Sequence, residues 1–266
     1  MTKLICVRSI YDQLGLNHAP ALIDLRPASE LERVPRMIPG AVHVEAHSIE
    51  QWLRKRQHQT VTLYSTSEHE IGSVANALSN SGVRVCLLEG GIDAWISHDL
   101  PTIRVRQELG VPGRSQWVTR ERPKIDRIAC PWLVRRFIDP LATFHYVPPK
   151  RVRSDANVLG AQPYDIPDVT FSHRGLRCSF DAFLDEFELH DPILDELARI
   201  VRAADTATLE QSREAPGLLA ISLGLSASTT DDQLLLEQAM LIYDALYAWC
   251  KTARDEPHSW PKQASA

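Results

Sequence analysis

The sequence lacks the features that mark membrane and secreted proteins. No apolar run approaches the roughly 20 residues that a helix needs to cross a bilayer. The first residues turn polar too early for a secretory signal peptide, so we expect a cytoplasmic protein with no membrane partner. The net charge is only −5 over 266 residues, which gives no general attraction to nucleic acid.

Cysteine is scarce, and no Cys-x-x-Cys pair occurs, which argues against a structural zinc site of that type. In a reducing compartment we expect free thiols, most of them buried as small hydrophobic side chains. The five cysteines are Cys6, Cys86, Cys130, Cys178 and Cys250.

The chain is long enough for two domains, and its pattern changes near residue 110. Before that point, short apolar runs alternate with amphipathic stretches, which predicts an α/β domain with a parallel sheet flanked by helices. The strands are expected at residues 22–25, 61–64 and 83–88.

After that point the pattern is mainly helical, which predicts an α-rich α+β domain. Strands are expected at residues 117–119 and 143–147, and helices at 126–138, 179–187, 192–203 and 231–254. We therefore place one domain at 1–108, a glycine- and proline-containing linker at 109–115, and a second domain at 116–266.

Four segments of the first half stand in the order and spacing of one known family: Leu22–Arg26, Ile38–Val42, the strand ending at Tyr64, and Leu88–Trp95. Together they resemble the rhodanese family. Active members place a cysteine directly after that central strand, where backbone N–H groups stabilise a thiolate or persulfide. The resemblance puts Ser65 in that place, and a serine hydroxyl cannot carry a persulfide.

The resemblance therefore implies a first domain without sulfurtransferase activity. Glu68 and Glu70 in the same loop would also oppose an anion. We expect a structural or docking module, with a protein partner as its ligand. The alternative is that Ser65 is a hydrolytic nucleophile with His69 as its base, but no acid that would orient His69 is identifiable.

The second half contains three chemically dense tracts, Trp117–Pro140, Gly160–Pro167 and Ser172–Ala182, and a shorter one, Ala203–Thr206. These tracts resemble the C-terminal domain of ChrB-type chromate-resistance proteins. The resemblance implies a role in the response to chromate, a tetrahedral dianion much like sulfate.

Basic residues of the second half suit such an oxyanion, because arginine forks and helix N-termini bind tetrahedral anions. The candidates are Lys124, Arg127, Arg174 and Arg177. The alternative is a solvated basic face that the domain's own acids balance.

Cys130 is followed by Pro131, and proline favours the first position of a helix. A thiol at the preceding N-cap has a lowered pKa and is reactive toward oxidants. Alternatively the helix begins at Asp126, which leaves Cys130 buried.

His173, Cys178 and Asp181 lie close together in sequence and offer the ligand types that hold iron, manganese or zinc. The alternative gives each residue a structural role. His173 then forms a hydrogen bond with the backbone, Asp181 caps the following helix, and Cys178 is part of the core.

The favoured function is a chromate-resistance protein that binds an oxyanion or a metal ion as a sensor or accessory factor. The alternative is a metal- or thiol-dependent redox enzyme that reduces chromate or removes superoxide. A transcriptional regulator ranks lower, because no helix-turn-helix signature or basic recognition helix is present and nucleic acid is not an expected partner.

Overall fold

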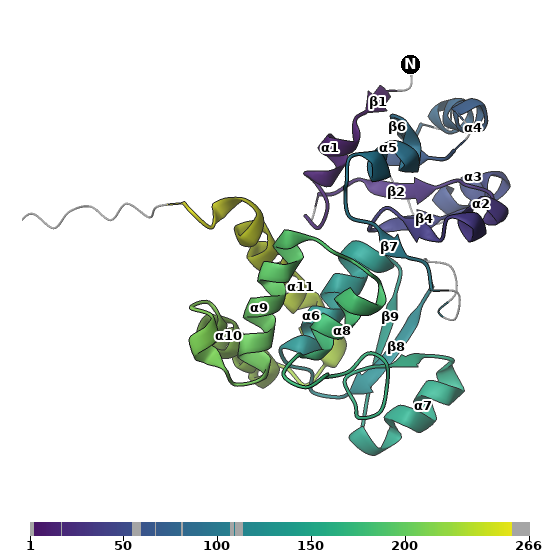
Figure 1. Cartoon of the computed structure of the whole chain (residues 1–266). Helices are drawn as coiled ribbons and strands as arrows, with labels where there is room; N and C mark the ends of the chain where they lie inside the picture. Colours follow the sequence, from purple (N-terminus) through teal and green to yellow (C-terminus); the bar gives the residue numbers. More distant parts are fainter. Residues whose placement is uncertain are drawn as a thin grey trace, which may run out of the picture.

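The first half folds as a five-stranded parallel sheet flanked by helices, as its pattern predicts (Figure 1). The computed structural model describes residues 3–16, 18–54, 60–66, 68–80, 82–106, 109 and 114–256. The strands lie in the order β1-β6-β5-β2-β4, and every neighbouring pair is parallel. They are β1 (Lys3–Ile5), β2 (Ala21–Asp24), β4 (Ala41–His43), β5 (Thr60–Tyr64) and β6 (Arg84–Leu88).

Helices cover both faces of this sheet. One face packs against α3 (Ile49–Arg54) and α4 (Glu68–Asn80) through a core that includes Ile23, Leu63 and Ile71. The other face packs against α1 (Val7–Tyr11) and α5 (Gly91–Ser97). A short helix and an antiparallel strand pair complete this half: α2 (Ala28–Arg33), β3 (Arg36–Met37) and β7 (Ile103–Arg104).

The second half is rich in helices around a small parallel sheet in the order β10-β8-β9. Its strands are β8 (Gln116–Arg120), β9 (Thr143–Val147) and β10 (Gln162–Pro163). Its helices are α6 (Asp126–Leu133), continued by a π-helical turn at Val134–Ile138, α7 (Val152–Leu159), α8 (Ser179–Glu186), α9 (Pro192–Asp205), α10 (Ala215–Ser228) and α11 (Asp232–Ala248).

The sequence pattern did not reveal α10. Pro216, Gly217 and Gly224 weaken its local helical signal, and it carries no charged residue to mark a solvent-facing side. Its burial is also reversed, because Ser222 and Ser226 are buried while Ile221 and Leu223 are exposed. The polar face is used internally, since the Ser222 hydroxyl accepts a hydrogen bond from the Ile125 N–H.

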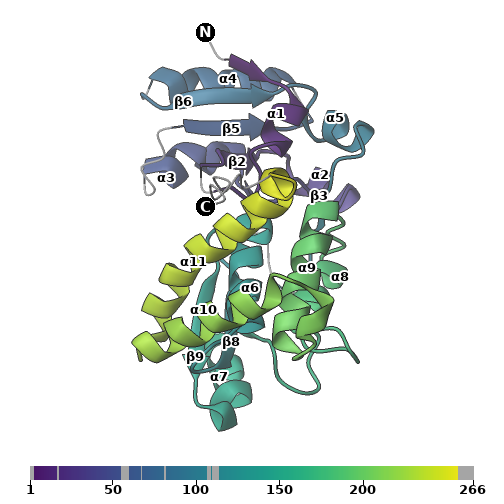
Figure 2. The same cartoon turned by 90° about the vertical axis from the view of Figure 1, so that its left-hand side faces the viewer.

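The two halves share one hydrophobic core. Buried residues of the first half, such as Ile10 and Trp95, belong to the same cluster as Trp132 and Tyr247 of the second. Figure 2 shows α11 running up to the underside of the first half. Polar contacts also cross the interface, and the side chain of Lys251 donates to the carbonyl oxygens of Tyr11 and Leu14 at 2.9 and 3.2 Å.

The expected linker at 109–115 falls mostly outside the described residues, because residues 110–113 are not described. The boundaries of the two domains therefore stay a prediction. Over the described ranges, no helix is both long enough and apolar enough to span a membrane.

Candidate functional site

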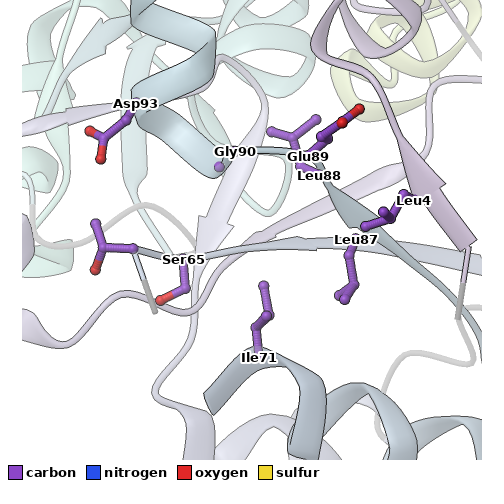
Figure 3. A pocket seen from close by; sticks show the side chains of 10 residues that line it. Leu4, Ser65, Ile71, Leu87, Leu88, Glu89, Gly90 and Asp93 are labelled. Carbon is purple, nitrogen blue, oxygen red and sulfur yellow. The ribbon is translucent and has the colours of Figure 1, made fainter. Parts of the chain in front are cut away.

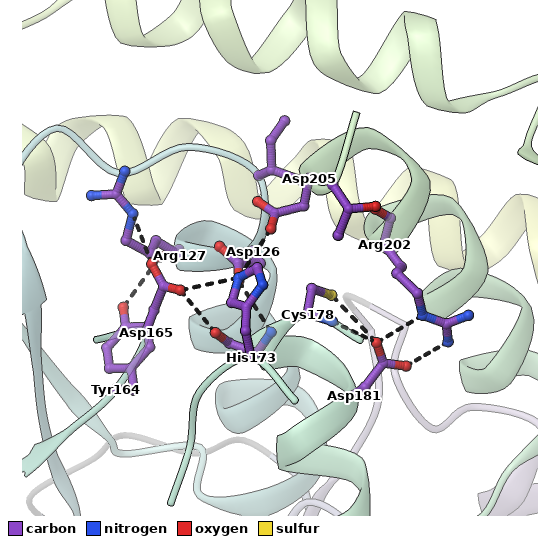
Figure 4. A network of polar contacts seen from close by, with 12 residues as sticks. Asp126, Arg127, Tyr164, Asp165, His173, Cys178, Asp181, Arg202 and Asp205 are labelled. Carbon is purple, nitrogen blue, oxygen red and sulfur yellow. Dashed lines mark hydrogen bonds and ion pairs between the residues drawn. The ribbon is translucent and has the colours of Figure 1, made fainter. Parts of the chain in front are cut away.

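Three acids from distant parts of the second half surround His173 (Figure 4). Asp126 is the first residue of α6, Asp165 follows β10, and Asp205 is the last residue of α9. The His173 Nε2 atom lies 3.2 Å from Asp126 Oδ2, 3.3 Å from Asp165 Oδ1 and 3.2 Å from Asp205 Oδ2. One ligand atom each from Asp126, His173 and Asp205 can be chosen so that all lie within 4.8 Å of one another.

The charges of this cluster are mutually dependent. Hydrogen bonds to Asp126, Asp165 and Asp205 raise the pKa of His173 to about 12. Complete burial is the largest effect on the pKa of Asp126 and raises it, the neighbouring Asp165 and Asp205 add to the rise, and His173 opposes it, so that the pKa comes to about 7. Three carboxylates around one imidazole thus form a site that needs positive charge at its centre.

Asp165 is held rigidly at the edge of the cluster. Burial would raise its pKa, but hydrogen bonds from His173, Arg120 and Ser179 outweigh burial and keep the pKa low. Its Oδ2 atom accepts from Arg120 Nη2 at 2.5 Å, and its Oδ1 atom accepts from the Ser179 hydroxyl at 2.9 Å. Asp165 therefore remains a carboxylate beside the buried Asp126.

The backbone around the cluster adopts unusual conformations. Ile125, directly before Asp126, has φ 40° and ψ −103°, and Asp165 has φ 52°. A β-branched residue with positive φ costs on the order of 1–3 kcal/mol and persists only where its surroundings hold it. Here the Ser222 hydroxyl accepts from the Ile125 N–H at 3.0 Å, and the Tyr243 hydroxyl donates to the Ile125 carbonyl at 2.7 Å.

The side chains around the cluster belong to the part of the chain that matches a known family. Residues 117–250 match the family described as ChrB, C-terminal domain. The chain belongs to the ChrB C-terminal domain family. Residues 9–98 match the Rhodanese-like domain, so the first half is a rhodanese-like domain.

Related proteins cover the chain only in part. Protein ChrB from Cupriavidus metallidurans is 36% identical over 169 residues, which is 63% of this chain and 49% of that protein. The chain thus spans about half the length of the curated relative that it matches.

Solved structures resemble this chain at low identity. A rhodanese-related protein from Thermoplasma volcanium is 20% identical, has a TM-score of 0.33, and covers 38% of this chain and 96% of its own. A thiosulfate sulfurtransferase from Pseudomonas aeruginosa is 13% identical, has a TM-score of 0.35, and covers 60% of this chain and 43% of its own. These similarities concern the fold and not the activity.

Within the ChrB C-terminal domain, Cys178 and Asp181 do not join His173 in one group of ligand atoms. Cys178 is the N-cap of α8, and Asp181 accepts a hydrogen bond from its backbone N–H at 3.0 Å. The Asp181 carboxylate also binds the Arg202 guanidinium through both oxygens. These contacts match the structural alternative for the two residues, and the potential ligand atoms that converge with His173 are those of Asp126 and Asp205.

Cys130 does not occupy an N-cap. The helix begins at Asp126, and Cys130 lies inside it, fully buried. Burial raises the pKa of this thiol well above its usual value, and nearby acids add to the effect. The sequence had left this alternative open, and the structure selects it over the reactive thiol.

Three of the four candidate anion-binding residues are already paired with acids. Arg127 contacts Asp165, Arg174 contacts Glu186, and Arg177 contacts Asp185. Lys124 is exposed, and it forms no ion pair with any described residue. The arrangement matches a basic face balanced by acids more closely than a shared oxyanion site.

Thiol reactivity is expected to follow this placement. Cys6 is exposed, and its hydrogen bonds with Ser9 lower its pKa, so it should react first with a disulfide reagent in native protein. Cys130 and Cys178 should react only on unfolding, because both are buried. The measurement is the time course of labelling, with peptide mapping of the products. A Cys6→Ser variant should lose the fast phase, and native labelling of Cys130 would contradict the assignment.

The tracts that carry the family resemblance each supply one member of the cluster. Asp126 comes from the first tract, Asp165 from the second, and Asp205 from the short fourth one. Sequence reasoning singled out only His173, from the third. An aspartate in each tract was visible, but nothing local distinguished these aspartates from those that cap helices.

Proposed function

We propose that this protein acts in the cellular response to chromate and holds a divalent metal ion at Asp126, His173 and Asp205. The chromate role rests on its family membership and on its similarity to protein ChrB. The metal site rests on one observation, the convergence of three potential ligand atoms within 4.8 Å of one another.

The electrostatics of the cluster support a cation. A buried carboxylate is strongly disfavoured unless a positive charge or hydrogen bonds compensate it, and Asp126 is buried next to two other acids. In the metal-free chain, a protonated His173 supplies that charge. A divalent ion would replace the proton and leave neutral imidazole as a ligand.

The donor types narrow the choice of metal. Carboxylate oxygens with a single imidazole suit manganese or iron(II), whereas structural zinc sites are usually rich in thiolate. The cysteines near the cluster are buried in structural positions, so the oxygen-rich set favours manganese or iron over zinc.

The site is accessible on one side, because the His173 side chain is 41% exposed. Metal sites with an open position bind small molecules, and sites closed by protein ligands are structural. When bound, the ion would act as a Lewis acid toward an oxyanion from solvent. Sensing or an accessory role fits this arrangement, and a redox enzyme would use the same site.

The rhodanese-like half is proposed to be a support without sulfur-transfer chemistry. Ser65 directly follows β5, and the resemblance to the rhodanese family implies that active members carry their cysteine in this place. The core that this half shares with the ChrB C-terminal domain supports a structural role.

The test is elemental analysis of protein purified without a metal-affinity step. We expect close to one equivalent of manganese or iron in the wild type and less than about one tenth as much in His173→Ala, because removing a ligand typically costs more than the 10–100-fold seen for outer-shell changes. His145→Ala is the matched control, since His145 contacts Gln116 outside the cluster and should keep its metal. Turnover of chromate or superoxide by the loaded protein distinguishes an enzyme from a sensor. Full metal content in His173→Ala, or none in the wild type, would overturn the site.

A further inference from the structure

A pocket of about 380 Å³ lies at the carboxyl edge of the first sheet, beside Ser65 (Figure 3). Ligands of parallel sheets bind at this edge, and the volume falls in the range of small-molecule sites. Ser65 and Asp93 lie on one side of the pocket, and Leu4 and Glu89 lie on the other.

The pocket is acidic. Glu89 and Asp93 line it, and no lysine, arginine or histidine does so among the residues whose side chains the structure describes, which leave out residues 67–70. Two arginines that interact electrostatically with Asp93 are already paired with other acids, because Arg26 is bound to Asp24 and Arg33 to Glu30.

Two helices begin at this pocket, and their positive ends oppose the acids only in part. A helix N-terminus carries about half a positive charge, so α4 and α5 together supply roughly one against two carboxylates. The balance favours a cationic ligand, which is the opposite of what a persulfide loop requires.

The Ser65 hydroxyl supplies an independent indication. Its Oγ atom is buried and forms no hydrogen bond with any described residue. Buried polar atoms are rarely left without a partner, so this oxygen marks a position where a ligand or a water molecule completes the site. A hydroxyl oxygen can accept a hydrogen bond from an ammonium group.

Apolar side chains form the remaining walls. Ile71 and Leu87 line the interior, and Leu4 stands at the mouth as a residue that is 62% exposed. An alkyl chain ending in an ammonium group matches this distribution, because its stem lies along apolar surface while its head meets the acids.

We propose that this pocket binds the side chain of a lysine presented by a partner protein. The ammonium group lies between Ser65 and Asp93, the alkyl stem packs on Leu87, and the backbone of the partner meets Leu4. This role is independent of the metal site in the other half.

The test is titration of the full-length, isotope-labelled chain with N-acetyl-lysine methylamide, followed by amide chemical shifts. We expect saturable shifts at residues of this pocket, and none with the ε-acetylated analogue, which has the same shape but no charge. Asp93→Asn should weaken binding about tenfold, because it removes a charge-assisted hydrogen bond. Asp99→Asn, just beyond α5, is the matched control and should bind as the wild type does.

Additional variants and ligands distinguish a lysine site from an anion site and from a site for a free amine. Ser65→Ala should also weaken binding, and a thermal unfolding curve for each variant shows that it is folded. Tighter binding of thiosulfate than of the amine would overturn the proposal in favour of an anion site. If the free diamine cadaverine binds and the lysine amide does not, the ligand is not a lysine of a partner protein. If Asp93→Asn binds as tightly as the wild type, the ammonium group does not lie beside Asp93.

Discussion

Replacing Asp126 by asparagine is expected to stabilise the metal-free protein and to abolish its stabilisation by a divalent ion. Burial and neighbouring acids raise the pKa of Asp126 from 3.8 to about 7, so its ionised form is disfavoured in the folded chain. At pH 8 that penalty reaches up to about 4 kcal/mol, at 1.36 kcal/mol per pKa unit. Asparagine removes the charge and keeps an oxygen that can accept from the Ser179 N–H.

The sign follows from the raised pKa in the folded state. The contribution of Asp126 is most favourable below its unfolded pKa and is lost as the pH rises through about 7. The pKa of His173 is also raised in the folded state, so its contribution to stability is likewise lost as the pH rises above its usual pKa of 6.5. The metal-free wild type should therefore be less stable at pH 8 than at pH 5, and Asp126→Asn should reduce this difference.

Urea unfolding at both pH values, with a chelator or with manganese, measures both effects. An ion at 100 times its dissociation constant should stabilise the wild type by about 2.7 kcal/mol and the variant by almost nothing. Asp185→Asn is the control, because Asp185 lies in a surface ion pair worth about 0–1 kcal/mol. A variant that is less stable at pH 8, or that manganese still protects, would refute the role given to Asp126.

Gly40→Ala is expected to destabilise the whole chain by about 3 kcal/mol or more. Gly40 has φ +74°, a conformation that side chains rarely adopt, and an added Cβ atom would lie 2.8 Å from the carbonyl oxygen of Arg136 in the other half. The Gly40 N–H also donates to the Phe137 carbonyl at 2.7 Å, so the backbones cannot move apart without losing this bond.

Gly160→Ala provides the matched control. Gly160 has φ +61°, but an added Cβ atom there has nothing within 4 Å, so its cost is the conformational strain of about 1–2 kcal/mol alone. The difference in the free energy of unfolding between the two variants measures the cost of the steric contact between Gly40 and the other half. Because the halves share a core, fluorescence and circular dichroism should report one transition in the wild type. Equal losses of stability in Gly40→Ala and Gly160→Ala would contradict the proposed steric contact.

Much of the fold could be read from the sequence because its signals are local. The strands β2, β5 and β6 follow apolar runs, and the helices α6, α8, α9 and α11 follow regular apolar spacing. The helix α10 could not be found in this way. On its buried side the Ser222 hydroxyl accepts a hydrogen bond from the Ile125 N–H, and the Ser226 backbone carbonyl accepts one from Arg122, so its burial follows tertiary contacts and not hydrophobicity.

The candidate site was predictable only in part. His173 was recognisable as a ligand type, but its neighbours in sequence, Cys178 and Asp181, turned out to cap α8. Cys130 and Pro131 suggested a helix start, yet the helix begins four residues before Cys130, where the strained Ile125 precedes Asp126. A local motif cannot show which of two possible starts the surrounding contacts will hold.

The sequence by itself determined the rhodanese-like and ChrB-type organisation of the chain and the presence of His173, since these depend on residue identity and order. Only the tertiary structure decided that Asp126, Asp165 and Asp205 meet at that histidine and that the two halves share one core. The physical reason is that both the cluster and the core join side chains from elements far apart in the chain, and their distances are set by packing and not by spacing.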